Sequence, residues 1–101
     1  MNILRRYTQR IALIVFTSNK NAICEARNNL YNSNIREYAF LVDKDIDLKM
    51  GDVVIVEVRD SIQLATFTRY SNKKEHRRIA FKRILEKTKL NALNEDFKYE
   101  Y

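Results

Sequence analysis

The sequence has few of the residues on which common catalytic and metal sites depend. It contains one glycine, Gly51, one cysteine, Cys24, one histidine, His76, and no proline in 101 residues. A glycine-rich phosphate loop needs several glycines, and the common zinc sites need three or four Cys or His ligands. A lone cysteine forms no intramolecular disulfide, which is typical of a reducing compartment. We therefore expect no enzymatic activity, no metal and no cofactor.

Long apolar segments are also lacking. The apolar run at residues 11–16 has six residues, whereas a membrane-spanning helix needs roughly 20, and no N-terminal stretch resembles a signal peptide. Apolar residues make up 46% of the chain, enough for one hydrophobic core at this length. We expect one soluble, cytoplasmic domain over residues 1–101, with its oligomeric state open. Residues 1–9 are interpreted as either a mobile basic arm or an extension of the first strand.

Positive charge is abundant and concentrated in one part of the chain. The formal net charge is +6. Residues 69–89 contain nine Lys or Arg and two Glu, a net charge of +7, so the remaining residues sum to −1. Residues 43–60 instead contain six carboxylates against three basic residues. Charge of this size bears on partners rather than on fold, and we expect a basic region suited to nucleic acid or to an acidic protein surface.

Hydrophobic periodicity predicts a mainly β or α+β fold. Four segments are rich in β-branched and aromatic residues and have the length of strands: residues 11–17, 37–43, 52–59 and 62–70. The last two would form a hairpin across Asp60 and Ser61. Strict alternation along 62–70 would place Tyr70 on the face opposite Phe67. Residues 20–31 have helical spacing and follow a polar segment with N-cap residues, so we expect one helix inserted after the first strand.

The second half of the chain has less regular patterns. Gly51, in Met50-Gly51-Asp52, is the strongest turn signal, because glycine adopts positive φ at little steric cost. Residues 71–75 are polar and indicate a loop. Residues 77–87 fit either a strand or a helix, with helix favoured by propensity. Residues 90–101 would form a docked tail or a short helix.

Residues 38–68 have the sequence YAFLVDKDIDLKMGDVVIVEVRDSIQLATFT. This segment combines a strand, a connector ending in Gly-Asp, a valine-rich strand, a tight turn and another strand. It resembles the small-barrel domain of the polymerase-suppressor family and, more distantly, the N-terminal DNA-binding barrel of the primosomal helicase. The resemblance implies a small five-stranded SH3-like or OB-like barrel, with residues 77–87 as the closing strand and no catalytic residues. The framework positions would be Leu48, Gly51, Asp52, Val54 and Val56. The chain departs from the pattern in its glycine-free turn at Asp60-Ser61 and in the insertion at residues 18–36.

Four carboxylates come nearest to a metal-binding motif: Asp43, Asp45, Asp47 and Asp52. The spacing Asp-x-Asp-x-Asp is similar to the start of a calcium-binding loop. The glycine and the distal glutamate of such a loop are missing at the required positions. We interpret this segment as a solvated acidic connector, or as one that mimics phosphate.

The basic region gives the candidate site. Phosphate binding needs several cations along one surface, and aromatic rings add stacking for the bases. The expected nucleic-acid contacts, which have Phe81 beside them, are Arg69, Lys73, Lys74, Arg77, Arg78, Lys82, Arg83 and Tyr70. The competing interpretation is a solvated charged surface, in which Lys and Arg protect an edge strand from aggregation.

Two functions follow from these features. The first is a non-enzymatic accessory protein that binds DNA or RNA and comes from a phage or mobile element, an origin suggested by the abundance of Asn, Lys, Ile and Tyr. The second is a protein-interaction module, such as a phage-encoded, anti-CRISPR-like inhibitor of a host nucleic-acid enzyme or defence effector. In that case the acidic segment 43–60 or the basic region would cover the target's substrate-binding surface.

Overall fold

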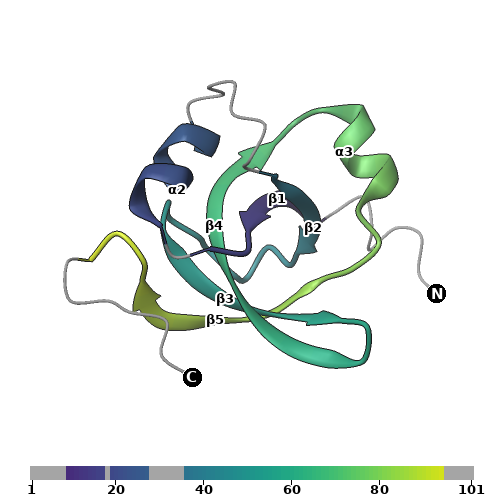
Figure 1. Ribbon diagram of the computed structural model, residues 1–101. Helices are drawn as coiled ribbons and strands as arrows, with labels where there is room; N and C mark the ends of the chain where they lie inside the picture. Colours follow the sequence, from purple (N-terminus) through teal and green to yellow (C-terminus); the bar gives the residue numbers. More distant parts are fainter. Residues whose placement is uncertain (1–8, 18, 28–35, 95–101) are drawn as a thin grey trace.

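The computed structural model describes residues 9–17, 19–27 and 36–94. In them the chain forms one five-stranded antiparallel sheet and two short helices (Figure 1), so the expected mainly β class is confirmed. The elements in chain order are β1 (Arg10–Val15), α2 (Lys20–Arg27), β2 (Tyr38–Val42), β3 (Asp52–Val58), β4 (Ser61–Ser71), α3 (Lys74–Ile79) and β5 (Ile84–Asn91). The strands lie in the order β2-β1-β4-β3-β5. Among the described residues, no helix has both the length and the apolar character needed to cross a membrane.

The predicted hairpin is formed by β3 and β4. Val58 pairs with Ser61 across the two-residue turn Arg59-Asp60. Both turn residues have positive φ, 50° for Arg59 and 65° for Asp60. Turns of this kind match the right-handed twist of the two strands, although Asn and Gly are the residues that adopt them most easily. The hairpin therefore forms without a glycine, as expected, but its turn lies at Arg59-Asp60, one residue before the predicted Asp60-Ser61, because Ser61 already pairs with Val58.

Helix α2 begins at the predicted residue, Lys20. Asn19 caps it, because its Oδ1 accepts hydrogen bonds from the backbone N–H groups of Asn21 at 2.9 Å and Ala22 at 3.3 Å. The described part of the helix ends at Arg27, and residues 28–31 of the predicted helix lie outside the described residues.

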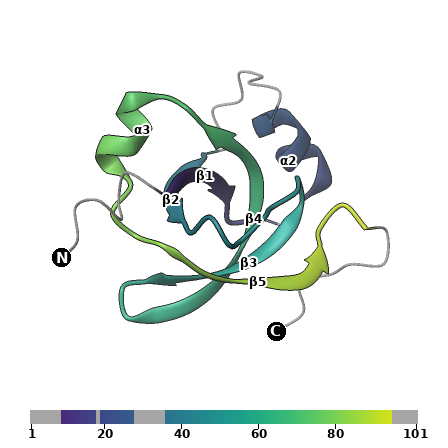
Figure 2. The ribbon, with the colours of Figure 1, turned by 180° about the vertical axis from the view of Figure 1, so that it is seen from behind.

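The sheet curls round (Figure 2), and the main core lies on its inner face. All five strands and the connector before β3 contribute to it: Ala12, Ile14, Phe40, Val42, Leu48, Val54, Val56, Ala65, Phe67 and Ile84. A second cluster lies on the outer face, where Ile23 and Ala26 of α2 pack with Val53. Alternation along β3 explains the division, since neighbouring residues of a strand point to opposite faces. Burying one such side chain fully contributes about 1.5–3 kcal/mol, so the two clusters dominate the stability of the fold.

A β-bulge changes the alternation of β4. The register of β1 against β4 shifts between Leu13 and Ile14, at the level of Thr68. Thr68 Oγ1 donates to the Leu13 carbonyl at 3.0 Å. The extra residue brings Tyr70 to the inner face beside Phe67, with ring centroids 4.8 Å apart. The strict alternation predicted for this strand is therefore wrong at Tyr70.

The segment after β4 also differs from the prediction. α3 begins at Lys74, inside the expected polar loop, and no single element spans residues 77–87, since α3 ends at Ile79 and β5 begins at Ile84. The helix stops where Ala80 is buried against Ile11, and Ile84 then enters the main core. β5 continues to Asn91, so the predicted tail at 90–101 starts inside a strand. Residues 1–8 and 95–101 lie outside the described residues.

The two edge strands, β2 and β5, approach each other at one point. An isolated bridge joins Leu41 to Arg83, and the Leu41 N–H donates to the Lys82 carbonyl at 2.8 Å. This contact fixes the path of residues 80–83, the link between α3 and β5. The described strand pairings form a ladder that runs from β2 to β5.

Gly51 makes the predicted sharp turn before β3. Its φ of +92° lies in the region that residues with a side chain rarely adopt. Its N–H donates to the Phe67 carbonyl at 2.8 Å, and its carbonyl accepts from the Ala92 N–H at 2.7 Å. Gly51 is thus bound on both sides, to β4 and to the chain just after β5.

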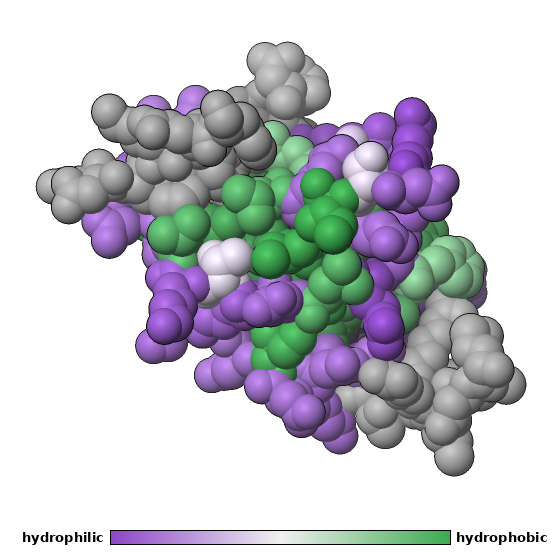
Figure 3. Space-filling model, turned by 90° about the horizontal axis from the view of Figure 1, so that it is seen from below, coloured by the Kyte–Doolittle hydropathy of each residue, from purple (hydrophilic) through white to green (hydrophobic). Residues whose placement is uncertain are grey.

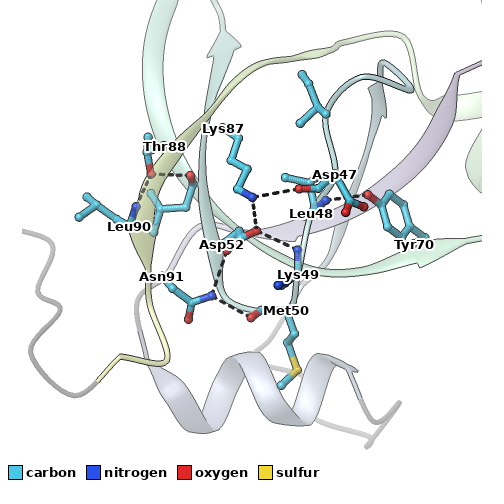
Figure 4. A network of polar contacts seen from close by, with 12 residues as sticks. Asp47, Leu48, Lys49, Met50, Asp52, Tyr70, Lys87, Thr88, Leu90 and Asn91 are labelled. Atoms are coloured by element: carbon cyan, nitrogen blue, oxygen red, sulfur yellow. Dashed lines mark hydrogen bonds and ion pairs between the residues drawn. The ribbon is translucent and has the colours of Figure 1, made fainter.

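Asp52 is the centre of a polar network beside this turn (Figure 4). Its carboxylate accepts from the Lys49 N–H at 2.8 Å and from Asn91 Nδ2 at 3.0 Å, and it lies 3.4 Å from Lys87 Nζ. A buried carboxylate is stable only when it is paired in this way. The network ties the connector to β5 and gives Asp52, one of the acidic residues noted in the sequence, a structural role.

Candidate functional site

The structure divides eight of the nine basic residues of 69–89 into two groups, and the ninth, Lys89, is exposed on β5. Members of the first group contact the protein itself. Arg69 Nη2 lies 3.0 Å from the Glu37 carboxylate, Arg77 Nη2 donates to the Gln9 carbonyl at 3.0 Å, and Lys87 belongs to the Asp52 network. These three side chains hold separate parts of the chain together.

The second group is exposed around α3 and the link that follows it: Lys73, Lys74, Arg78, Lys82 and Arg83. In both ribbon views α3 lies on the same side of the molecule as the tip of the β3–β4 hairpin (Figures 1 and 2). The five exposed residues of the second group are therefore gathered near this side.

Tyr70, which the sequence suggested as a stacking platform, has a structural environment. Its hydroxyl accepts from the Leu48 N–H at 3.0 Å. The guanidinium of Arg10 lies over its ring, 4.3 Å from the centroid, and the Phe67 ring packs against it. The ring is half-buried and joins the connector to the core.

A groove of about 670 Å³ lies between β2, the hairpin tip and the α3–β5 link. Four Phe or Tyr rings line it, from Phe16, Tyr38, Phe40 and Phe81, together with three cationic side chains, from Arg36, Arg59 and Lys82. Among the described residues that line it, Glu37 is the one carboxylate, and its oxygens accept from Thr68 Oγ1 at 2.8 Å and Arg69 Nη2 at 3.0 Å. The groove therefore combines rings with positive charge that its own carboxylate does not neutralise.

A smaller hollow of about 460 Å³ continues past Phe81. Its charged lining residues are Glu57, Arg59, Asp60, Lys82 and Arg83, a net charge of +1. Three residues line both spaces, namely Arg59, Phe81 and Lys82. We call these three the Phe81 ridge, because they separate the groove from the hollow.

The local backbone explains why Phe81 points outward. Ala80 is completely buried against Ile11 and Leu41, and its two neighbours consequently point away from the core. Ile79 is 64% exposed and Phe81 is 72% exposed. Two large apolar side chains are therefore exposed on either side of a buried alanine. In the sequence this appears as an aromatic residue isolated among cations.

His76 lies in the groove wall at the start of α3. Its Nδ1 contacts Ser71 Oγ, which also accepts from the Lys73 N–H at 3.2 Å. The pair connects the end of β4 to the first turn of the helix. These contacts position the wall of the groove.

The acidic connector is tied to the fold at its two ends. Gln9 Nε2 donates to Asp43 Oδ1, and Asp52 is the centre of the network described above. Within residues 9–17, 19–27 and 36–94, no three His, Cys, Asp or Glu side chains are grouped so that they could hold a metal ion. The interpretation of the connector as a phosphate mimic stays a prediction.

An apolar band lies on the outer face of β3, β4 and β5. Ile55 pairs with Leu64, Ile62 lies two residues further along the same face, and Leu90 follows on β5. Ile62 and Leu90 are exposed, and Ile55 and Leu64 are half-buried. Seen from below, apolar side chains form a continuous region between polar ones (Figure 3).

Sequence reasoning found part of the groove. Of the expected nucleic-acid contacts, Lys82 lines the groove and Arg83 lines the smaller hollow. The sequence analysis did not identify Arg36, Tyr38 and Arg59 as groove residues, because they lie outside the basic region in the sequence. These residues meet the α3–β5 link because β2 and β5 approach each other at the sheet edges and because the hairpin tip extends beside them.

Comparison of the chain with protein-family models, curated protein sequences and solved structures gave no match. The resemblance of residues 38–68 to the polymerase-suppressor barrels stays a prediction. The function must therefore be argued from the site itself.

Proposed function

We propose that this protein is a non-enzymatic, nucleic-acid-binding accessory protein of phage or mobile-element origin, and that its groove receives the phosphate backbone. One observation carries the proposal: the cationic side chains Arg36, Arg59 and Lys82 converge on one groove whose carboxylate, Glu37, is already bound by the protein. Each phosphate bound there would release condensed counterions, which is the main source of non-specific affinity for nucleic acid.

The exposed cations near the groove extend this surface. Lys73, Lys74 and Arg78 lie on α3 or just before it, and Arg83 lies beside Lys82. We retain these residues, with Arg77 at the edge of the surface, as contacts with nucleic acid. We leave out Arg69 and Tyr70, because the ion pair to Glu37 and the packing in the core already account for their side chains. The net charge of +6 supports the same proposal.

A binding assay at two salt concentrations tests the proposal. Fluorescence anisotropy with labelled single- and double-stranded DNA and RNA would be measured at about 50 and 200 mM salt, a range over which phosphate-dependent affinities fall steeply. We expect binding at low salt that weakens at high salt. Lys82→Glu and Arg36→Glu should weaken binding, and removal of each cation that binds a phosphate should reduce the slope of log affinity against log salt by about one. Lys44→Glu, an exposed position in the acidic connector, is the matched control and should have the smaller effect. Absence of binding to every probe at low salt would overturn the proposal.

A protein-interaction module is the second candidate, and the apolar band of Ile55, Ile62, Leu64 and Leu90 is the observation that favours it. Contiguous exposed apolar regions on small proteins often mark contacts with other proteins. The partner would be a nucleic-acid enzyme or a defence effector of the host. After nuclease treatment, a pull-down should capture a protein that Leu90→Asp loses and Phe81→Ala retains. Equal capture by both variants would contradict a role for the band.

We also propose that the curled sheet is a small barrel of the SH3-like or OB-like kind. The bridge between Leu41 and Arg83 supports this, because it joins the two edges of the sheet. Burial of Leu48, Val54 and Val56, which the family resemblance marks as framework positions, supports it too. An experimental structure with continuous pairing of β2 and β5 would establish the barrel, and separated edges would exclude it.

A further inference from the structure

We propose that the groove takes single-stranded nucleic acid and that the ring of Phe81 stacks against its bases, an inference that rests on the function proposed above. Phe81 is 72% exposed, more than any other large apolar side chain in the described part of the chain. It stands between the groove and the smaller hollow, and Arg59 and Lys82 line both spaces with it. An exposed ring with cations on both sides is the arrangement with which proteins hold a single strand.

The ridge is fixed before any ligand arrives. Ala80 is buried against the sheet, and the Lys82 carbonyl is bound by the Leu41 N–H at 2.8 Å. The backbone on each side of Phe81 is thus held in place, while its ring extends outward. A platform that is already ordered loses little conformational freedom on binding, and more of the stacking free energy becomes affinity.

The opposite wall supplies a second ring and a cation. The guanidinium of Arg36 lies 5.2 Å from the centroid of the Tyr38 ring, over its face. The Phe16 ring meets Tyr38 edge-on, at a centroid distance of 5.2 Å and an interplanar angle of 66°. With Arg36 stacked there, this wall presents charge for a phosphate.

Paired and unpaired bases differ in whether they can reach such a ring. In a duplex both faces of each base are covered by its stacked neighbours, and a side chain beside the helix reaches the backbone and the groove edges. Bases of a single strand can be splayed onto an aromatic side chain. Every base has a π-face, so we expect preference for single strands with little preference for sequence.

Three probes of equal length separate stacking from charge, because the abasic strand has as many phosphates as the oligothymidine and the duplex has twice as many. They are a labelled oligothymidine of about 12 nucleotides, within the site size of one small domain, its duplex with oligoadenosine, and an abasic strand of the same length. We expect the oligothymidine to bind most tightly. Phe81→Ala should weaken its binding on the order of 5- to 150-fold, the range for loss of one stacked base. The affinity for the abasic strand should not change. Ile62→Ala, which also removes an exposed apolar side chain, is the matched control.

A tryptophan in place of Phe81 reports the contact directly. The chain has no tryptophan, so Phe81→Trp places the single one at the ridge. Its fluorescence should be quenched by oligothymidine and not by the abasic strand. Leu90→Trp, at an exposed position on β5, should show no quenching with either probe.

The outcomes distinguish this inference from the proposed function. The first outcome is that the duplex and the single strand bind equally tightly, that Phe81→Ala binds the two probes like the wild type, and that Lys82→Glu binds them more weakly. In that case the stacking inference is wrong and the proposed function stands. If no probe binds at low salt, both are wrong. Quenching of Phe81→Trp by the abasic strand would also contradict stacking.

Discussion

Replacement of Gly51 by alanine tests the turn on which the β3 register depends. A Cβ at this position would lie 2.5 Å from Asn91 Oδ1 and 2.8 Å from Leu93 Cγ. Both distances are shorter than side-chain contacts allow, so Asn91 and Leu93 have to move. The new residue would also have to keep a φ of +92°, which residues with a Cβ rarely adopt.

The expected loss of stability comes from these two sources. Backbone strain of this kind is worth roughly 1–3 kcal/mol. Displacing Asn91 breaks its hydrogen bonds to the Met50 carbonyl at 3.1 Å and to Asp52 Oδ1 at 3.0 Å, and the one that it accepts from the Leu93 N–H at 2.9 Å. Each contributes roughly 0.5–1.5 kcal/mol, and more where the acceptor is charged. We expect Gly51→Ala to lower the free energy of unfolding by about 3–6 kcal/mol, a large part of the roughly 5–15 kcal/mol of a typical domain.

Urea denaturation followed by far-UV circular dichroism measures this change, and the m-value should stay constant if only stability is altered. In a background carrying Asn91→Ala the clash with Asn91 is absent, so Gly51→Ala should then cost roughly 1–3 kcal/mol less than in the wild type. Lys49→Ala, an exposed side chain in the same segment, should stay within about 0.5 kcal/mol of the wild type. A loss of less than about 1 kcal/mol of unfolding free energy for Gly51→Ala would refute the need for glycine, since backbone strain alone should exceed that value. Equal losses in the wild-type and Asn91→Ala backgrounds would refute the role of Asn91.

Two further predictions concern the core and the ridge. Thr68→Val should lower the free energy of unfolding by about 1–3 kcal/mol. The substitution removes the buried hydroxyl that contacts the Leu13 carbonyl at 3.0 Å and the Glu37 carboxylate at 2.8 Å. The same urea titration measures the loss, and an unchanged midpoint would contradict the structural role of the bulge. Phe81→Ala should leave the free energy of unfolding within about 0.5 kcal/mol of the wild type, because the side chain is exposed. Ile14→Ala should lower it by about 2–5 kcal/mol, because Ile14 is completely buried. Similar losses for the two variants would show that Phe81 belongs to the core.

The secondary structure was predictable wherever local pattern and tertiary packing favour the same state. β1 and β2 are short and apolar, with β-branched residues in β1 and aromatic residues in β2, and they formed as expected. The hairpin of β3 and β4 formed because both strands alternate and only two residues, Arg59 and Asp60, separate them. The helix α2 began where an asparagine caps it. In each case the deciding interactions lie within a few residues of one another in the sequence.

The prediction was wrong where contacts between distant residues decide the structure. The bulge at Thr68 depends on the carbonyl of Leu13, 55 residues away, and it placed Tyr70 on the same face as Phe67 instead of the opposite face. The break between α3 and β5 depends on burial of Ala80 against Ile11 and Leu41. Propensity, which sums local preferences, contains no information on such contacts.

The sequence by itself determined that this is one basic, mainly β chain with a glycine turn before β3, because charge, composition and periodicity are properties of residues near one another. The tertiary structure alone decided which cations are available to a partner. It directed Arg69 to Glu37 and Lys87 to Asp52, and it brought Arg36 and Arg59 to Lys82 from other strands. The physical reason is that a binding surface is made of side chains close in space, and the order of the strands, β2-β1-β4-β3-β5, places those side chains together.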